Sequence, residues 1–124
     1  MKATFIEMSE FTEWISEHLS DKEYASVQQQ LMDDPDAGVV MTGCGGMRKI
    51  RTSDPKRGKG KRGGARVIYL HVPEAKRFYL LDVYGKDEKD DLSAKEKKLL
   101  KKLAEKLKLE AIAAYKRWLK ENGL

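Results

Sequence analysis

Cysteine is nearly absent from this chain of 124 residues, since Cys44 is the only one. A single thiol cannot form an internal disulfide or a cysteine-based zinc site, which excludes disulfide scaffolds and zinc modules. Long apolar runs are also lacking, because no stretch approaches the ~18 residues of a membrane helix. Residues 1–7 become acidic too early for a signal peptide. We therefore expect a protein of the reducing cytoplasm, with residues 1–124 forming a single domain.

Positive and negative charges are distributed unevenly, although the net charge is only +5. Residues 1–47 have a net charge of −7, residues 48–66 of +8, and residues 67–124 of +4. Seven of the ten glycines lie between positions 43 and 64. A charge run alone is compatible with a solvated loop. Cations interleaved with glycines favour a segment that holds a phosphate backbone, because glycine lets a backbone approach a ligand closely.

Hydrophobic periodicity predicts two helices in the first third of the chain. One is expected over about 10–19, with Ser9 as its N-cap. Ser20 and Glu23 form a capping box that begins the second helix. Pro35 requires this helix to end by the preceding residue. Two helices so closely connected form a helical hairpin.

β-branched and aromatic residues predict strands over 3–8, 47–52, 66–72 and 77–84. Ser93 begins a long helix to about residue 121, with Gly123 just beyond its end. The apolar stripe of this helix consists of Leu99, Leu103, Leu107, Ala111, Ala114 and Trp118.

The order strand–helix–helix–strand–strand–strand–helix defines an α+β fold with a small, mainly antiparallel sheet. We expect the helical hairpin and the C-terminal helix to cover one face of that sheet and to leave the other free. The last helix would be ~43 Å long, against a diameter of about 35 Å for a compact domain of this size. Residues 108–124 are therefore expected to form an extension that overhangs or bends near Lys108. The apolar residues of 109–121 can either fold back on their own domain or contact a second chain, and we expect the contact with a second chain, either another copy or a partner.

Several motifs indicate chemistry that their context does not support. Residues 58–63 match GxGxxG, but a dinucleotide site needs a helix straight after the loop and here a strand follows. No phosphate-binding GxxxxGK[ST] loop is present, and the acidic residues do not form a metal-ligand set, so no cofactor or metal is expected. His18 and His71 are interpreted as structural residues, and Cys44 as an incidental small one.

The remaining constellation is cationic. Strand alternation places Lys49 with Arg51, and Tyr84 with Lys86, while Arg66 lies on one face of its own strand. If these faces coincide, the five side chains surround one groove. Such a set can stabilise the charge that develops on a pentavalent phosphorus. The attacking group can be the RNA 2′-OH itself, with a tyrosine or a deprotonated lysine moving protons.

Five segments together resemble RelE/HigB-type toxins, and the HigB subgroup with a Gly/Lys loop is the most similar. The resemblance covers about 2–110 and agrees with the predicted order of elements. Its motifs are Gly45–Arg51, Gly58–Gly64, Ala65–Tyr69, Phe78–Leu81 and Val83–Lys86.

The resemblance implies a ribosome-dependent endoribonuclease that cuts mRNA in the decoding site, with an antitoxin of the helix-turn-helix type as partner. It implies that Arg66 stabilises the phosphate, that Lys59 and Lys61 line the loop side of the site, and that Tyr84 and Lys86 lie at the exit of the last strand. We assign the catalytic role to Arg66, Tyr84, Lys86 and Lys59. The residues expected to bind RNA are Lys49, Arg51, Lys56, Arg57, Lys61 and Arg62.

Two departures from the family pattern leave the proton-transfer group open. Some members have an arginine shortly after the GK pair and a tyrosine on the C-terminal helix, where this chain has Asp87 and Ser93. An alternative is a non-catalytic module that binds RNA or the ribosome on the same scaffold. A DNA-binding helix-turn-helix over 10–33 is less favoured, because that hairpin is acidic and would repel DNA.

Overall fold

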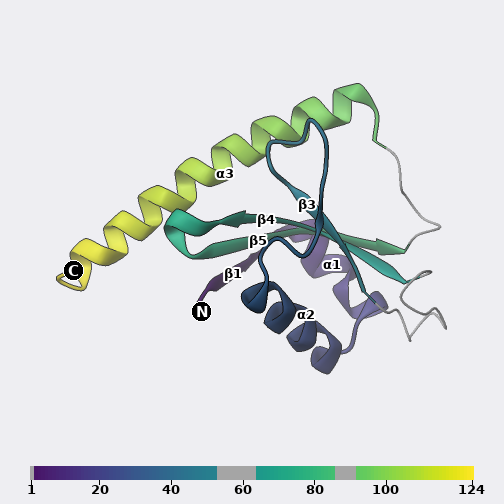
Figure 1. Cartoon of the computed structure of the whole chain (residues 1–124), viewed down its shortest axis with the longest axis horizontal. Coiled ribbons are helices and arrows are strands. Elements are labelled where there is room, and N and C mark those ends of the chain that lie inside the picture. Colours follow the sequence, from purple (N-terminus) through teal and green to yellow (C-terminus); the bar gives the residue numbers. More distant parts are fainter. Residues whose placement is uncertain (1, 53–63, 86–91) are drawn as a thin grey trace.

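The computed structural model describes residues 2–52, 64–85 and 92–124. At its centre is a five-stranded sheet with the order β1-β5-β4-β3-β2 (Figure 1). β1 is parallel to β5, and the other neighbours are antiparallel. All four expected strands are confirmed, and the sequence did not indicate β2, whose two exposed valines carry no periodic signal. The strands are β1 (Thr4–Glu7), β2 (Val39–Val40), β3 (Arg48–Arg51), β4 (Ala65–Val72) and β5 (Arg77–Gly85).

Helices lie on both faces of the sheet. α1 (Ser9–His18) and α2 (Asp21–Asp33) pack on one face, and α3 (Ala94–Glu121) packs on the other (Figure 1). The α+β class is confirmed, but the expectation that all helices cover one face is wrong. The physical reason is the composition of the two central strands. β4 and β5 are almost continuously apolar, and a strand of that kind needs cover on both faces.

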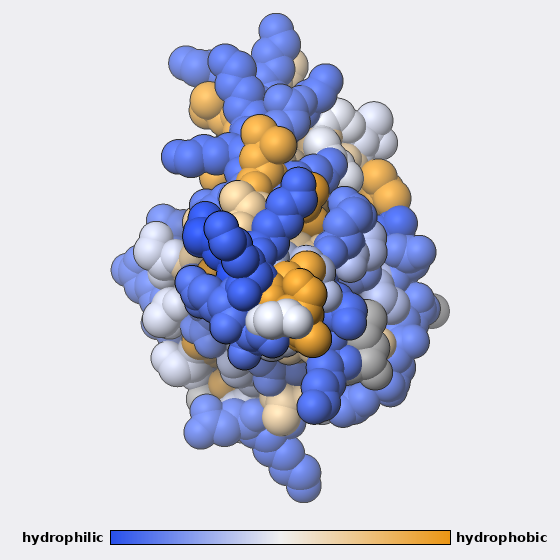
Figure 2. Space-filling view, turned by 90° about the vertical axis from the view of Figure 1, so that its left-hand side faces the viewer, coloured by the Kyte–Doolittle hydropathy of each residue, from blue (hydrophilic) through white to orange (hydrophobic). Residues whose placement is uncertain are grey.

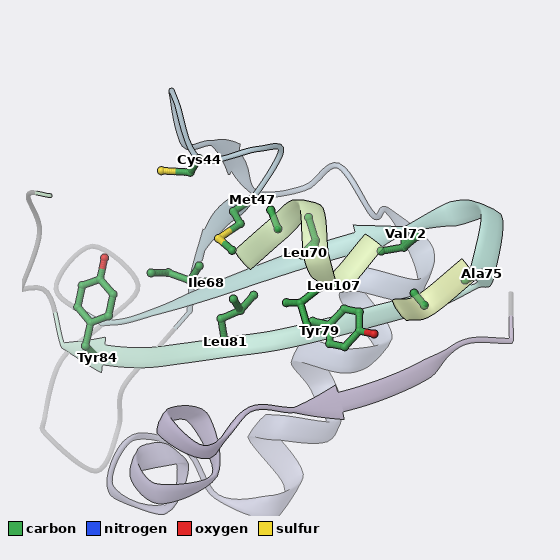
Figure 3. Packing of buried hydrophobic residues seen from close by; sticks show 12 residues of the cluster. Cys44, Met47, Ile68, Leu70, Val72, Ala75, Tyr79, Leu81, Tyr84 and Leu107 are labelled. Atoms are coloured by element: carbon green, nitrogen blue, oxygen red, sulfur yellow. The ribbon is translucent and has the colours of Figure 1, made fainter. Parts of the chain in front are cut away.

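Alternate residues of the central strands belong to two separate hydrophobic clusters. Val67 and Tyr69 face α1 and α2, where they join Phe11 and Leu31. Their neighbours on β4 face α3 instead, where they join Met47, Tyr79 and Leu107 (Figure 3). The sheet therefore separates two cores and holds β4 rigidly between them.

The local signals at the helix ends are largely confirmed. Ser20 and Ser93 both form complete capping boxes, with Glu23 and Glu96 as their partners. α2 ends at Asp33, as Pro35 requires. The beginning of α1 differs by one residue, because Met8 is its N-cap and Ser9 is already helical.

α3 is a single helix of 28 residues that extends beyond the sheet at its C-terminal end (Figure 1). The expected overhang is therefore present. Leu107 and Ala111 are fully buried in the middle of the stripe, whereas Leu99 near one end is 59% exposed and Trp118 near the other is 50% exposed. No helix in the described part of the chain is long and apolar enough to cross a membrane.

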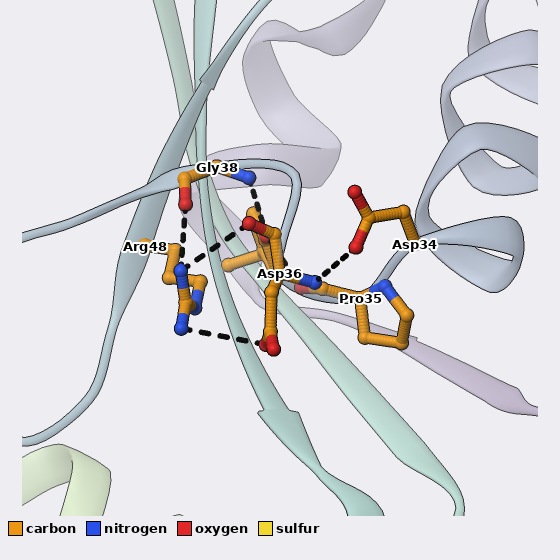
Figure 4. Close-up of polar contacts among 6 residues, drawn as sticks. Asp34, Pro35, Asp36, Gly38 and Arg48 are labelled. Atoms are coloured by element: carbon orange, nitrogen blue, oxygen red, sulfur yellow. Dashed lines mark hydrogen bonds and ion pairs between the residues drawn. The ribbon is translucent and has the colours of Figure 1, made fainter.

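Hydrogen bonds and an ion pair connect the turn after α2 to the sheet (Figure 4). Tyr69 Oη donates a hydrogen bond to the Pro35 carbonyl at 2.7 Å and accepts one from the Gly38 amide at 3.0 Å. Burial raises the pKa of this tyrosine, so its hydroxyl stays protonated and can donate. Arg48 binds the Gly38 carbonyl at 2.8 Å and the Asp36 carboxylate at 3.4 Å. These contacts hold β3 in register beside β4.

Candidate functional site

Three polar side chains form a row across the end of the sheet where β4 begins. Arg66 of β4 pairs with Arg51 of β3 on one side and with Tyr84 of β5 on the other. Directly paired residues of neighbouring strands lie on the same face. Lys49, two residues before Arg51, lies on this face too. The structure therefore brings four of the predicted site residues to one face.

This face is the one that α3 covers. Tyr84 belongs to the same hydrophobic cluster as Ala104 of α3 and is itself buried. Figure 3 shows its ring near the end of β5, on the same side of the sheet as Ile68 and Leu81. The site is thus at the edge of the hydrophobic cluster between the sheet and α3, which we call the α3 core. Apolar side chains of this core adjoin the row of Arg51, Arg66 and Tyr84 there.

Arg66 is only 1% exposed, although the sequence analysis placed its side chain at an open groove. Its Nη1 donates a hydrogen bond to the Gly64 carbonyl at 2.9 Å. Its Nη2 is buried and has no hydrogen-bond partner among the residues that the structure describes. Arginine keeps its charge in proteins, so a buried and incompletely paired guanidinium is costly. Such a group is suited to bind an anion through a donor that is already dehydrated.

A pocket of about 270 Å³ adjoins the row on the side of β3. Lys49 lines it from the sheet and Lys97 lines it from the first turns of α3, with Leu92 and Cys44 between them. Lys97 was not among the site residues predicted from the sequence. A signal was nevertheless present, because residues 94–108 contain seven lysines and only two glutamates. The beginning of α3 therefore adds positive charge to the site.

Six predicted site residues lie outside the described residues, and their placement is not described. They are Lys56, Arg57, Lys59, Lys61, Arg62 and Lys86. Arg66, Tyr84, Lys49 and Arg51 are the predicted site residues that the structure places.

The two histidines do not belong to the row. Within the described ranges, no three His, Cys, Asp or Glu side chains come together as possible metal ligands. His71 pairs with Phe78 and stacks on its ring at 4.4 Å, on the opposite face from Arg66. Burial lowers the pKa of His71, which favours the neutral imidazole of a core residue. His18 is fully buried in α1.

The fold and the row define a class of protein: a small α+β domain with two arginines and a tyrosine side by side across one end of its sheet. A comparison with protein-family models identifies the family to which this chain belongs. The model of the family described as the RelE toxin of the RelE/RelB toxin–antitoxin system matches residues 6–124. The chain belongs to this family and is a toxin of a toxin–antitoxin system, with a cognate antitoxin as its partner. The match includes the segment after residue 108, beyond the 2–110 that the motifs covered.

Proposed function

We propose that this toxin is an endoribonuclease that cuts mRNA on the ribosome by a metal-independent attack of the RNA 2′-OH. The observation that carries the proposal is the row of Arg51, Arg66 and Tyr84, with a buried guanidinium at its centre. We further propose that the toxin acts in the cytoplasm, belongs to the HigB subgroup and pairs with a helix-turn-helix antitoxin. The subgroup and the antitoxin type rest on the Gly/Lys loop and the motifs of the sequence, and the cytoplasm rests on the near absence of cysteine.

The chemistry needs charge stabilisation and two proton transfers. The 2′ oxygen attacks the adjacent phosphorus and loses its proton to a base. The bond from phosphorus to the 5′ oxygen breaks, and that oxygen takes a proton from an acid. The products are a 2′,3′-cyclic phosphate and a 5′-hydroxyl. The attacking oxygen belongs to the RNA, so the reaction requires neither a bound water nor a metal-activated nucleophile.

Each predicted site residue has one proposed part in this reaction. Arg66 would bind a non-bridging phosphate oxygen and stabilise the added negative charge of the transition state. Arg51 would hold the neighbouring phosphate. Tyr84, Lys86 and Lys59 are the candidates for the proton transfers. Six cations of the 48–66 segment would bind the RNA backbone: Lys49, Arg51, Lys56, Arg57, Lys61 and Arg62.

The alternative is a non-catalytic module that binds RNA or the ribosome through the same cations. Arg66 distinguishes the two functions. A backbone-binding surface works with exposed, hydrated cations, whereas a buried guanidinium is preorganised for charge that develops during a reaction. The burial of Arg66 therefore favours the enzyme.

The nature of the cleaved ends tests this proposal. Ribosomes programmed with a defined mRNA and treated with the toxin should yield 5′-hydroxyl ends and 2′,3′-cyclic or 3′-phosphate ends. End-specific ligation and mass spectrometry of the fragments would distinguish these from other ends. Fragments with 5′-phosphate and 3′-hydroxyl ends would refute the mechanism. Binding to ribosomes without any cleavage would favour the non-catalytic module.

A further inference from the structure

A second concave surface lies at the opposite end of the sheet from Arg66. It is a groove of about 320 Å³ between the beginning of β1, the β4–β5 turn and the distal part of α3. β4 runs from Arg66 to Val72 before that turn, and six residues of a strand span roughly 20 Å. The groove is therefore separate from the row of Arg51, Arg66 and Tyr84. We call it the distal groove, and the described residues that line it are Lys2, Ala3, Thr4, Ala75, Lys76, Arg77, Ala114, Tyr115 and Trp118.

The α3 side of the distal groove is aromatic. Tyr115 packs against the α3 core and stacks on Trp118, with ring centroids 6.2 Å apart and planes at 7°. This stacking fixes the indole of Trp118, yet half of its surface stays exposed. Figure 2 looks onto this end of the molecule and shows a few hydrophobic side chains within a mostly hydrophilic surface. A rigid, half-exposed indole in a groove is typical of an anchor for a partner side chain.

The opposite side of the distal groove is cationic. Lys2, Lys76 and Arg77 line it, and none of the described lining residues is acidic. Arg77 is held in place because its Nη1 donates a hydrogen bond to Tyr79 Oη at 3.2 Å, and its guanidinium lies 5.7 Å from the centre of that ring. The groove therefore combines a fixed aromatic wall with a positively charged rim.

We infer that the distal groove is the anchoring site for an acidic segment of the antitoxin. One aromatic or aliphatic side chain of that segment would pack on Trp118, and its carboxylates would face Lys2, Lys76 and Arg77. Charge argues against a second copy of the chain as the occupant, because a two-fold pairing would bring the same three cations face to face. The inference needs the membership of the toxin family and is independent of the proposed ribonuclease activity.

The distance from the row has a functional consequence. A segment bound in the distal groove does not by itself cover Arg66. The distal groove would therefore supply affinity for the antitoxin. Blocking the row would require a different part of the antitoxin. Substitutions at Trp118 should weaken the complex without changing the activity of the free toxin.

Titration calorimetry of the full toxin with its cognate antitoxin tests the inference. Trp118→Ala should weaken binding roughly 10–100-fold, as the loss of an aromatic anchor does. The double variant Lys76→Glu/Arg77→Glu should also weaken it, and more at low salt than at high salt. Trp14→Ala is the matched control, because this second tryptophan is 39% exposed on α1, on the other side of the sheet. Circular dichroism would verify that each variant is folded.

Fluorescence gives a second readout. In a Trp14→Phe toxin, Trp118 is the only tryptophan, and its emission should shift to shorter wavelength when the antitoxin covers it. Equal affinities for all variants, with unchanged emission, would overturn the inference. It would also be overturned if light scattering of the toxin alone showed a dimer that Trp118→Ala abolishes, because the occupant would then be a second copy. A toxin that cleaves no RNA but shows the expected loss of antitoxin binding would refute only the proposed activity.

Discussion

At the scale of the residue, Arg66 is the least expected feature of the molecule. Its pairing with Arg51 and Tyr84 follows from strand register, but its burial does not follow from the sequence. A strand that is buried on both faces leaves no exposed position for a side chain near its start. The guanidinium is therefore within the fold, and a buried charge with one donor unsatisfied among the described residues reduces stability.

Replacing Arg66 with an apolar residue should separate stability from activity. Arg66→Met has a similar length and removes the buried charge, so the melting temperature should stay unchanged or rise. Cleavage should fall by roughly 10²–10³-fold, because a preorganised charge donor is lost. Calorimetric unfolding and an assay of cleaved ends would measure the two effects. Arg66→Lys keeps the charge but lacks the planar fork, so it should also be impaired. A stable Arg66→Met toxin with full activity would contradict the catalytic assignment.

At the scale of the element, the position of α3 depends on one glycine. Gly45 has a φ of +70°, and a Cβ added there would lie 2.8 Å from the Cβ of Ala104. Lys108 of α3 donates a hydrogen bond to the Gly45 carbonyl at 2.6 Å. The loop before β3 and the helix thus approach each other at backbone distance. This contact positions the lysines at the beginning of α3 beside the site.

Gly45→Ala should therefore destabilise the toxin by about 2–4 kcal/mol, because steric overlap adds to backbone strain. Gly43→Ala is the matched control. Gly43 is in the same loop with a φ of +76°, but its Cβ would meet only the Lys97 side chain, at 3.9 Å. It should lose only the strain energy, on the order of 1 kcal/mol. Urea unfolding of both variants would measure the difference. Equal losses would mean that the approach of α3 to Gly45 does not matter.

Lys49 of β3 and Lys97 at the beginning of α3 should contribute to RNA binding. Replacing Lys49 and Lys97 with alanine should lower the slope of log affinity against log salt by about one to two units, since each phosphate contact contributes roughly 0.7–0.9. Replacing Lys116 and Lys120, at the other end of the same helix, removes the same charge and should leave the slope nearly unchanged. Binding to ribosomes at several salt concentrations would measure both slopes. Identical slopes for the two double variants would show that the pocket lined by Lys49 and Lys97 does not contact RNA.

At the scale of the whole molecule, the two helical layers differ in charge. The segment that contains α1 and α2 has a net charge of −7, whereas α3 has ten cations and four acidic residues. The sheet lies between these layers, so the toxin has one acidic and one basic side (Figure 1). The basic side includes the candidate site, so under the proposed function RNA would approach from the α3 side.

Residues 109–116 and 117–124 of the chain should differ in their contribution to stability. A chain that ends at Lys108 loses the fully buried Ala111 together with Ile112 and Tyr115, which pack on the α3 core. The lost apolar burial should lower the melting temperature by roughly 10 °C. A chain that ends at Lys116 keeps these contacts and should melt within a few degrees of the full chain. Thermal unfolding monitored by circular dichroism would compare them. If the shorter chain were as stable as the full one, the distal part of α3 would not belong to the core.

The local features of this toxin could be predicted from neighbouring residues in its sequence. Capping boxes at Ser20 and Ser93, the stop at Pro35 and the β-branched strands depend on neighbouring residues, and the order of the elements other than β2 could therefore be predicted. The resemblance to the toxin family rested on such short motifs as well, and the family match agrees with it.

Which elements pack together depends on contacts that form only in the folded chain. α3 and the α1–α2 hairpin pack on opposite faces because β4 and β5 have apolar side chains on both faces of the sheet, and both sets have to be buried. This consequence appears only when the strands are paired. Register across three strands placed Arg51 and Tyr84 on either side of Arg66, and the same packing buried Arg66. The distal groove likewise requires β1, the β4–β5 turn and α3 to converge. Burial and convergence depend on contacts between residues far apart in the chain, which local patterns do not encode.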